Sequence, residues 1–242
     1  MKNYYKELII SLTIILAAFI FKSAYTAKNY KDDTISVTGL GETSFVSDLI
    51  VWKGTFSRKD VNLKQAYTDL NNDRTYIKKY LISKGIKDKQ LVFSSVIITK
   101  EYDYFTDESG NNTSTFNGYK LEQTIEVESN EVDKVEEISR QVSELINSGV
   151  EFYSQSPEYF YTKLAELKLK MISQATKDAT NRAEKIAENA GSSLGKLKNA
   201  DMGVFQIVAQ NSSEDYSWGG SFNTSSKKKK ANITIKMKFM LD

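Results

Sequence analysis

The sequence predicts an α+β fold in which mostly antiparallel sheet is flanked by helices. Two observations predict this class. Stretches rich in β-branched and aromatic residues come in pairs, which is typical of hairpins and antiparallel sheet. Other stretches repeat apolar residues every three or four positions, which indicates helices. The expected order is ββ-α-ββ-α-β-α-ββ. With 242 residues, 40% of them hydrophobic, the chain is long enough to bury a substantial core.

The first hairpin and helix are expected near the start of this order. Residues 34–59 contain two β-rich runs that predict two strands. Gly39 and Gly41 lie inside the first run and indicate a bulge or a close approach of the backbone to another element. Apolar residues over 63–81 have helical spacing, and Gly85 follows as a candidate C-cap.

The remaining elements follow from the same patterns. We expect a second hairpin, a helix, a short strand interrupted by a proline, a long helix and two closing strands. Their ranges, in chain order, are 90–105 with 119–129, then 132–149, 151–162, about 162–190, 195–210 and 231–242. Segments 106–118 and 211–230 are rich in turn-forming and polar residues and are expected to be loops.

Two absences exclude several kinds of chemistry. The chain has no Cys and no His. A thiolate nucleophile, a zinc–sulfur site, a Ser–His–Asp triad and a His-based metal site are therefore excluded. A carboxylate or Lys–Ser hydrolase needs neither residue type and stays open as an alternative. We assign no catalytic residue, no cofactor and no metal ligand.

The N-terminal segment 1–31 differs from the rest of the chain. It holds five lysines and one acid, whereas the remainder is slightly acidic and makes a poor nucleic-acid surface. Leu8 to Phe21 is an uncharged apolar run. It fits a signal-peptide core in length but is followed by no clean A-x-A cleavage site, and it is short for a spanning helix, so a membrane anchor and a cleaved signal both stay open. Either one would export the domain expected over 32–242.

The long helix carries a stripe of small apolar residues. Such residues let another element approach closely while each buries little area. The stripe can cover the chain's own sheet or contact a second subunit. As candidate assembly residues we name Met171, Ala175, Ala179, Ala183 and Ile186.

A second candidate surface is the aromatic and basic segment before the last strand. It can form a contact site for an anionic polymer or lipid headgroups, or simply a solvated rim that resists edge aggregation. The candidate residues are Tyr216, Trp218, Phe222, Lys227, Lys228, Lys229 and Lys230. Asp103, Asp107, Glu108 and Asn111 could gather around a calcium ion, but their spacing does not match a calcium-binding loop and they are expected to be solvated.

Three stretches together resemble the SIMPL-domain family of exported, YggE-like bacterial proteins. "ISVTGLGETSFVSDL" resembles the opening I-x-V-x-G-x-G followed by P-D, with Ser47 where proline is usual. "DATNRAEKIAENAGSSLGKL" resembles the helix motif, and "ITIKMKFML" the closing strand. The aligned motif positions are Ala175, Asp178, Ala179, Arg182, Ala183, Ile186, Ala187, Gly191, Leu194 and Gly195.

The resemblance implies an α+β domain of largely unassigned, non-enzymatic function. It implies a bacterial envelope location, on the periplasmic side and anchored to the inner membrane, or soluble in the periplasm if the signal is cleaved. It also implies homo-oligomers and a link to stress tolerance. We therefore expect an envelope interaction or scaffold protein that self-associates and contacts the membrane through its N-terminus.

Overall fold

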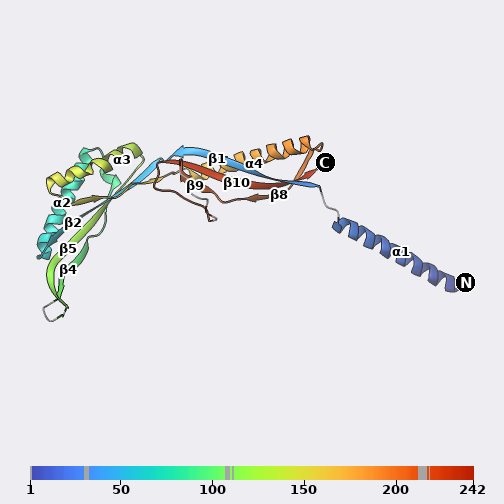
Figure 1. Cartoon of the computed structure of the whole chain (residues 1–242), viewed down its shortest axis with the longest axis horizontal. Helices are drawn as coiled ribbons and strands as arrows, with labels where there is room; N and C mark the ends of the chain where they lie inside the picture. The colour runs from blue at the N-terminus through green and yellow to red at the C-terminus, as the bar shows by residue number, and fades with distance from the viewer. Residues whose placement is uncertain (1, 30–32, 107–109, 111, 212–216, 218) are drawn as a thin grey trace. The chain divides into compact units, whose positions relative to one another are not determined.

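The computed structural model describes residues 2–29, 33–106, 110, 112–211, 217 and 219–242 (Figure 1). The α-helices are α1 (Lys2–Asn29), α2 (Leu63–Ser83), α3 (Val132–Gln141) and α4 (Leu164–Asn189), with 3-10 helices η1 (Asp88–Gln90) and η2 (Val142–Ser148). The strands are β1 (Thr34–Val46), β2 (Leu49–Asp60), β3 (Leu91–Phe93), β4 (Ile97–Thr106), β5 (Asn112–Ser129), β6 (Phe152–Ser154), β7 (Glu158–Phe160), β8 (Leu194–Met202), β9 (Gln206–Ala209) and β10 (Lys228–Leu241).

The predicted fold class is confirmed, including the long helix, α4. Three expected strands are each divided in two. The strand around Pro157 becomes β6 and β7, because proline cannot donate to a ladder. The strand expected over 195–210 is broken at Gly203, whose amide bonds to the Thr234 carbonyl at 2.8 Å.

The expected loop 106–118 is wrong in its second half, since β5 begins at Asn112. Asn117 is bulged out of the β4–β5 ladder, and Gly118 beside it has φ +126°. A bulge at Asn-Gly looks like a turn in the sequence, which explains the error.

The chain forms two compact units, each made of separate segments. Unit 1 contains Met1–Leu40, Ala175–Gly203 and Thr234–Asp242; unit 2 contains Gly41–Gln174 and Val204–Ile233. The sheet with strand order β1-β10-β8, in which β9 also pairs with β10, has residues in both units because β1 and β10 run from one into the other.

In unit 1 the second part of α4 packs on a sheet through small residues. Ala175, Ala179 and Ala183 are fully buried, as are the strand residues Ile235 and Met237. The helix therefore covers one face of the strands, while Lys236 and Lys238 of β10 alternate to the exposed face. Alanine at every fourth position keeps the helix axis close to the sheet.

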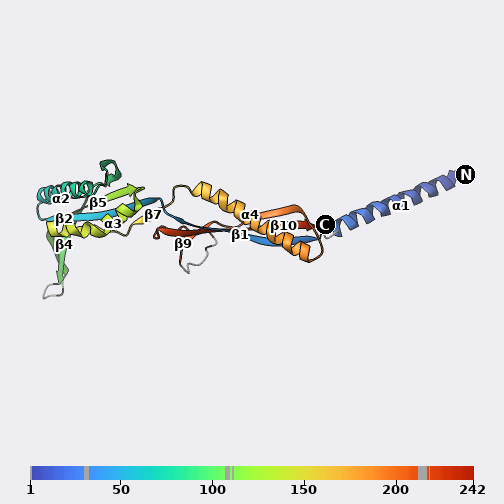
Figure 2. The same cartoon turned by 90° about the horizontal axis from the view of Figure 1, so that it is seen from above.

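Unit 2 is a sheet of order β3-β5-β2-β6 with two helices on one face. α2 and α3 share one apolar core with β2 and β5 (Figures 1 and 2). Its largest fully buried side chains include Trp52 and Phe56 of β2. The opposite face of the same strands carries polar pairs such as Lys53 with Glu126. The core therefore lies between the sheet and the two helices.

Candidate contact site

The lysine run lies at the start of a strand, not in the loop that the sequence suggested, because β10 begins at Lys228. Lys227 forms ion pairs with Asp133 and with Glu136 at 2.8 Å, both on α3. The ammonium group lowers the pKa of Glu136 below its usual range. Lys227 therefore ties the start of β10 to α3.

The other three lysines have different environments. Lys230 pairs with Glu42 of β1 at 2.8 Å, and Lys229 is only 1% exposed. Lys228 is exposed. Three of the four lysines thus have a described structural role, and the run offers one open ammonium group rather than four to an anionic partner.

Lys229 is an unusual buried cation because its described partners are neutral. Its Nζ donates to the Tyr159 carbonyl at 2.6 Å and to the Asn223 carbonyl, and lies 5.8 Å from the Phe222 ring centre. Burial lowers the pKa of Lys229 to about 8. Two neutral carbonyls stabilise a buried ammonium group less well than a carboxylate would, so burial favours the neutral amine. Lys229 thus connects β10 to β7 and to the loop that precedes β10.

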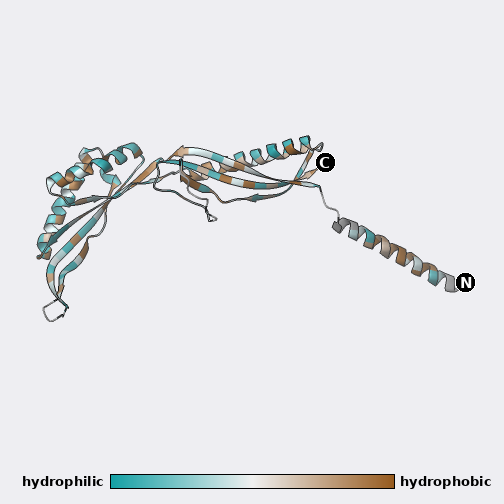
Figure 3. Ribbon diagram, viewed as in Figure 1, coloured by the Kyte–Doolittle hydropathy of each residue, from teal (hydrophilic) through white to brown (hydrophobic). Residues whose placement is uncertain are grey.

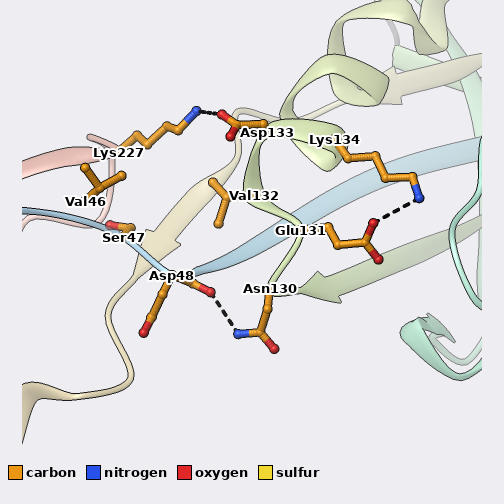
Figure 4. Close-up of a pocket in the computed structure, with 9 residues that line it drawn as sticks. All are labelled: Val46, Ser47, Asp48, Asn130, Glu131, Val132, Asp133, Lys134 and Lys227. Atoms are coloured by element: carbon orange, nitrogen blue, oxygen red, sulfur yellow. Dashed lines mark hydrogen bonds and ion pairs between the residues drawn. The ribbon is translucent and has the colours of Figure 1, made fainter.

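A surface hollow of about 340 Å³ lies where β1 ends and α3 begins (Figure 4). The Asp48 carboxylate accepts hydrogen bonds from the Thr162 amide at 2.7 Å and its hydroxyl at 2.8 Å. Asn130 donates to the Asp48 carbonyl at 2.8 Å, and Lys134 pairs with Glu131 at 3.1 Å. These polar groups hold the backbone in place and pair with one another.

Ser47 lines the same hollow and has the one orphaned hydroxyl among the described buried side chains. The residue is 4% exposed, and its amide donates to the Lys227 carbonyl at 2.9 Å. Proline, the residue usual here in the motif, would lose that amide bond and also bring no hydroxyl. The orphaned hydroxyl is therefore a consequence of serine at this position.

A second hollow, of about 480 Å³, lies between α3 and the β6–β7 segment. Burial and then the Glu136 charge raise the pKa of the Tyr159 phenol. Ser154 in its wall accepts from the Trp52 indole at 3.0 Å and donates to the Ser139 carbonyl at 3.0 Å. The Ser154 hydroxyl is therefore engaged in holding the core.

Metal binding finds no geometric support within the described ranges. No group of three or more Asp or Glu side chains there is placed to hold an ion. Of the acidic loop, Asp107 and Glu108 lie outside the described residues. The Asp103 carboxylate accepts a hydrogen bond from the side-chain amide of Asn117 at 2.5 Å.

The hairpin β4–β5 is a surface that sequence reasoning missed. Nearly every residue of β4 is exposed, and Tyr104 reaches 80%. The rings of Tyr102 and Phe116 are 5.8 Å apart, and those of Phe116 and Tyr119 are 5.1 Å apart. The run of β-branched and aromatic residues predicted a strand but could not show that both of its faces meet solvent.

The glycine-containing start of β1 and the alanine-rich part of α4 meet in unit 1. A Cβ on Gly39 would lie 2.1 Å from the Ala175 carbonyl oxygen and 2.7 Å from the Ala179 Cβ. Next to this contact, the Asp178 carboxylate accepts from the Leu40 amide at 2.9 Å. Arg182 pairs with the same carboxylate at 2.9 Å. Strand β1 and helix α4 are thus joined by residues of the two stretches that carry the family resemblance.

A comparison with known protein families finds a match. The family model SIMPL, described as "Protein of unknown function (DUF541)", matches residues 35–238. The chain belongs to the SIMPL family. A search of curated proteins found no match for this SIMPL chain.

The SIMPL helix motif accounts for most of the candidate assembly residues. Met171, Ala175, Ala179 and Ala183 are all 0% exposed within the single chain, whereas Ile186 is 51% exposed. The alanines are needed because Gly39 brings β1 against the helix. Of the five residues, only Ile186 offers a side chain to a second SIMPL subunit without rearrangement.

The candidate contact segment of the SIMPL domain is only partly described. Tyr216 and Trp218 lie outside the described residues. Phe222 is 49% exposed and adjoins the buried Lys229. One face of the Phe222 ring is thus used inside the chain.

Proposed function

We propose that this SIMPL protein is a membrane-tethered interaction protein of the bacterial envelope, that it self-associates and that it is not an enzyme. The observation that carries the interaction role is the exposure of β4, because soluble domains rarely leave a strand with apolar residues on both faces unpartnered. Its exposed apolar residues are Ile97, Ile98, Tyr102, Tyr104 and Phe105. The ribbon of the β4–β5 hairpin shows hydrophobic and hydrophilic bands in turn (Figure 3).

The tether is the N-terminal helix. Tyr5–Tyr25 has 21 residues with a mean hydropathy of 2.1 and none of its window buried. A helix of that length is about 32 Å long, which matches a bilayer core of about 30 Å. A signal-peptide core has about 7–15 residues, which the run from Leu8 to Phe21 also fits, so the anchor rests on the length of the whole helix and on the lack of a clean A-x-A cleavage site after the run.

The charged groups support an interaction role rather than catalysis. Glu136 is held by Lys227 and Arg140, and Asp48 by Thr162. Lys229, the group with the largest pKa change, is sealed from solvent by its own chain. Groups arranged in this way stabilise a fold and do not face a substrate.

The tether is tested by fractionation. We expect the full-length protein to stay in the membrane fraction after a high-pH carbonate wash, and intact-mass spectrometry to show the N-terminal segment still attached. A variant with Ile14→Glu and Ile15→Glu should leave that fraction, because charged residues at the centre of a spanning helix are costly. Cleavage after the apolar run would refute the anchor.

Self-association is tested separately by light scattering of the detergent-solubilised full-length protein, with the detergent mass subtracted. We expect one discrete mass that is a whole multiple of the 27.4 kDa chain. A monomer at every concentration would refute self-association and leave the tether intact.

A further inference from the structure

The outer edge of β4 is a free strand edge. In the described part of the chain β4 pairs only with β5, over Ile97 to Thr106. A ten-residue strand is about 33 Å long and presents a row of unpaired amides and carbonyls on its outer side. This is the geometry to which an added strand pairs.

The aromatic and acidic side chains at the centre of β4 lie on opposite faces. Tyr102 pairs with Phe116 across the ladder, so Tyr102 and Tyr104 lie on the aromatic face. Glu101 and Asp103 lie on the other face. Glu101 is paired with Lys59 at 2.6 Å, whereas Asp103 accepts a hydrogen bond from the neutral side chain of Asn117. At the centre of β4, Tyr102 and Tyr104 thus favour apolar neighbours on one face and Asp103 favours basic ones on the other, while Lys100 shares the first face and Ile97 and Phe105 share the second.

We propose that the β4 edge binds an extended segment of a different protein in which apolar and basic residues alternate. The apolar side chains would pack beside Tyr102 and Tyr104, and the basic ones beside Asp103. The assignment rests on the proposed interaction function and gives it a site and a partner chemistry.

The negative charge of the hairpin favours a basic protein segment over a lipid surface as the occupant. Residues 97–117 contain four acids, Glu101, Asp103, Asp107 and Glu108, and one base, Lys100. Envelope lipids present anionic headgroups, which such a hairpin would repel. Basic protein segments are attracted by the same charge.

The charges of β4 also disfavour a second copy of β4 as the occupant of this edge. In an antiparallel pair, directly opposite residues lie on the same face, which restricts the registers of a two-fold pair. A pair centred on Lys100 places Lys100 against Lys100, and one centred on Glu101 places Glu101 against Glu101. A pair centred on Tyr102 places Glu101 against Asp103. Each of these three registers opposes like charges, and registers centred nearer either end overlap over only a short part of β4.

The test uses a dye-labelled ten-residue peptide in which Val and Tyr alternate with Lys and Arg, titrated with the detergent-solubilised full-length protein. We expect saturable binding by fluorescence anisotropy. A peptide with Asp and Glu in place of Lys and Arg should bind at least about tenfold more weakly. Equal binding of the two peptides would overturn the partner chemistry.

Two N-methylated peptides test strand pairing without altering the protein. One carries N-methyl groups at odd positions and the other at even positions, which blocks the two edges of the peptide in turn. We expect one to lose binding by about tenfold or more and the other to keep it within about twofold. Similar binding of both would overturn edge pairing.

Protein variants locate the site. Asp103→Lys should weaken peptide binding about fivefold or more, whereas Glu188→Gln, an exposed acid on α4, should leave it unchanged. Dissociation of the oligomer by saturating peptide would show that a second copy occupies this edge and would overturn the assignment. Absent peptide binding with an intact membrane-bound oligomer would overturn this inference alone.

Discussion

The Asp178 carboxylate accepts a hydrogen bond from the Leu40 amide at 2.9 Å and joins helix α4 to strand β1. Arg182, one helical turn later, pairs with the same carboxylate at 2.9 Å. Gly39, immediately before Leu40, lies against Ala175 and Ala179. The two stretches that carry the family resemblance therefore form one structural contact, and their residue types are explained by packing and not by reactivity.

Gly39→Ala should destabilise unit 1, because the added Cβ would lie 2.1 Å from a backbone oxygen. Backbone cannot move aside cheaply, and we expect a loss of about 2–3 kcal/mol. Urea unfolding of the full-length protein in detergent, followed by far-UV circular dichroism, measures it. Gly219→Ala is the matched control, since its nearest neighbour would be 4.0 Å away. Equal stability of both variants would contradict the close contact.

Asp178→Asn should reduce the acid sensitivity of unit 1. The Leu40 amide and then Arg182 hold the pKa of Asp178 below its usual range. A carboxylate with a lowered folded-state pKa stabilises the fold above its unfolded pKa, and that stabilisation is lost as pH falls through the folded pKa. We expect the variant to be less stable by about 1 kcal/mol at pH 7, and this difference to shrink as the pH falls through the lowered pKa of Asp178. A constant difference across pH would contradict the ionic role.

Periodicity was sufficient to predict α2 and α4, whereas the helix expected over 132–149 is α-helical only to Gln141 and continues as the 3-10 helix η2. The Met171–Ala183 stripe and the glycine after it defined α4 within two residues, because a helix repeats every 3.6 residues whatever it packs against. The alternation in "ITIKMKFML" likewise predicted β10 and its buried face.

Environment could not be predicted from local pattern. Four consecutive lysines look like a solvated loop, yet Lys229 points into the chain because alternate residues of a strand face opposite sides. Lys227 finds Asp133 and Glu136 more than 90 residues away, and no local signal shows such pairs. The exposed edge of β4 depends on which strands pair, which periodicity does not determine.

Ser47→Ala should be neutral or slightly stabilising, which is unusual for a buried polar residue. The hydroxyl has no described partner, so its removal relieves a desolvation cost and breaks no bond. Ser154→Ala is the matched control, since its hydroxyl bonds to Trp52 and to the Ser139 carbonyl. We expect the control to lose about 1–2 kcal/mol in urea unfolding followed by tryptophan fluorescence. A loss of similar size for Ser47→Ala would show that its hydroxyl has a partner.

Lys229→Met should change the pH dependence of stability in the alkaline range. The pKa of Lys229 is about 8 in the folded chain against 10.5 for an ordinary lysine. Between these values the unfolded chain binds more protons than the folded one, so wild-type stability rises with pH over this window. The difference of pKa corresponds to about 3 kcal/mol. Below pH 8 the full penalty of the buried charge is present, and above 10.5 it is relieved.

The measurement is urea unfolding at pH 7.5, 9 and 10.5. The control is Lys228→Met, at the neighbouring exposed lysine. Lys229→Met leaves the Tyr159 and Asn223 carbonyls unpaired, so its absolute stability mixes two effects. The slope with pH isolates the charge, because the lost hydrogen bonds cost the same at each pH. We expect wild type and the control to gain about 3 kcal/mol relative to Lys229→Met between pH 7.5 and 10.5. Parallel profiles for all three proteins would mean that Lys229 keeps an ordinary pKa through a counter-charge.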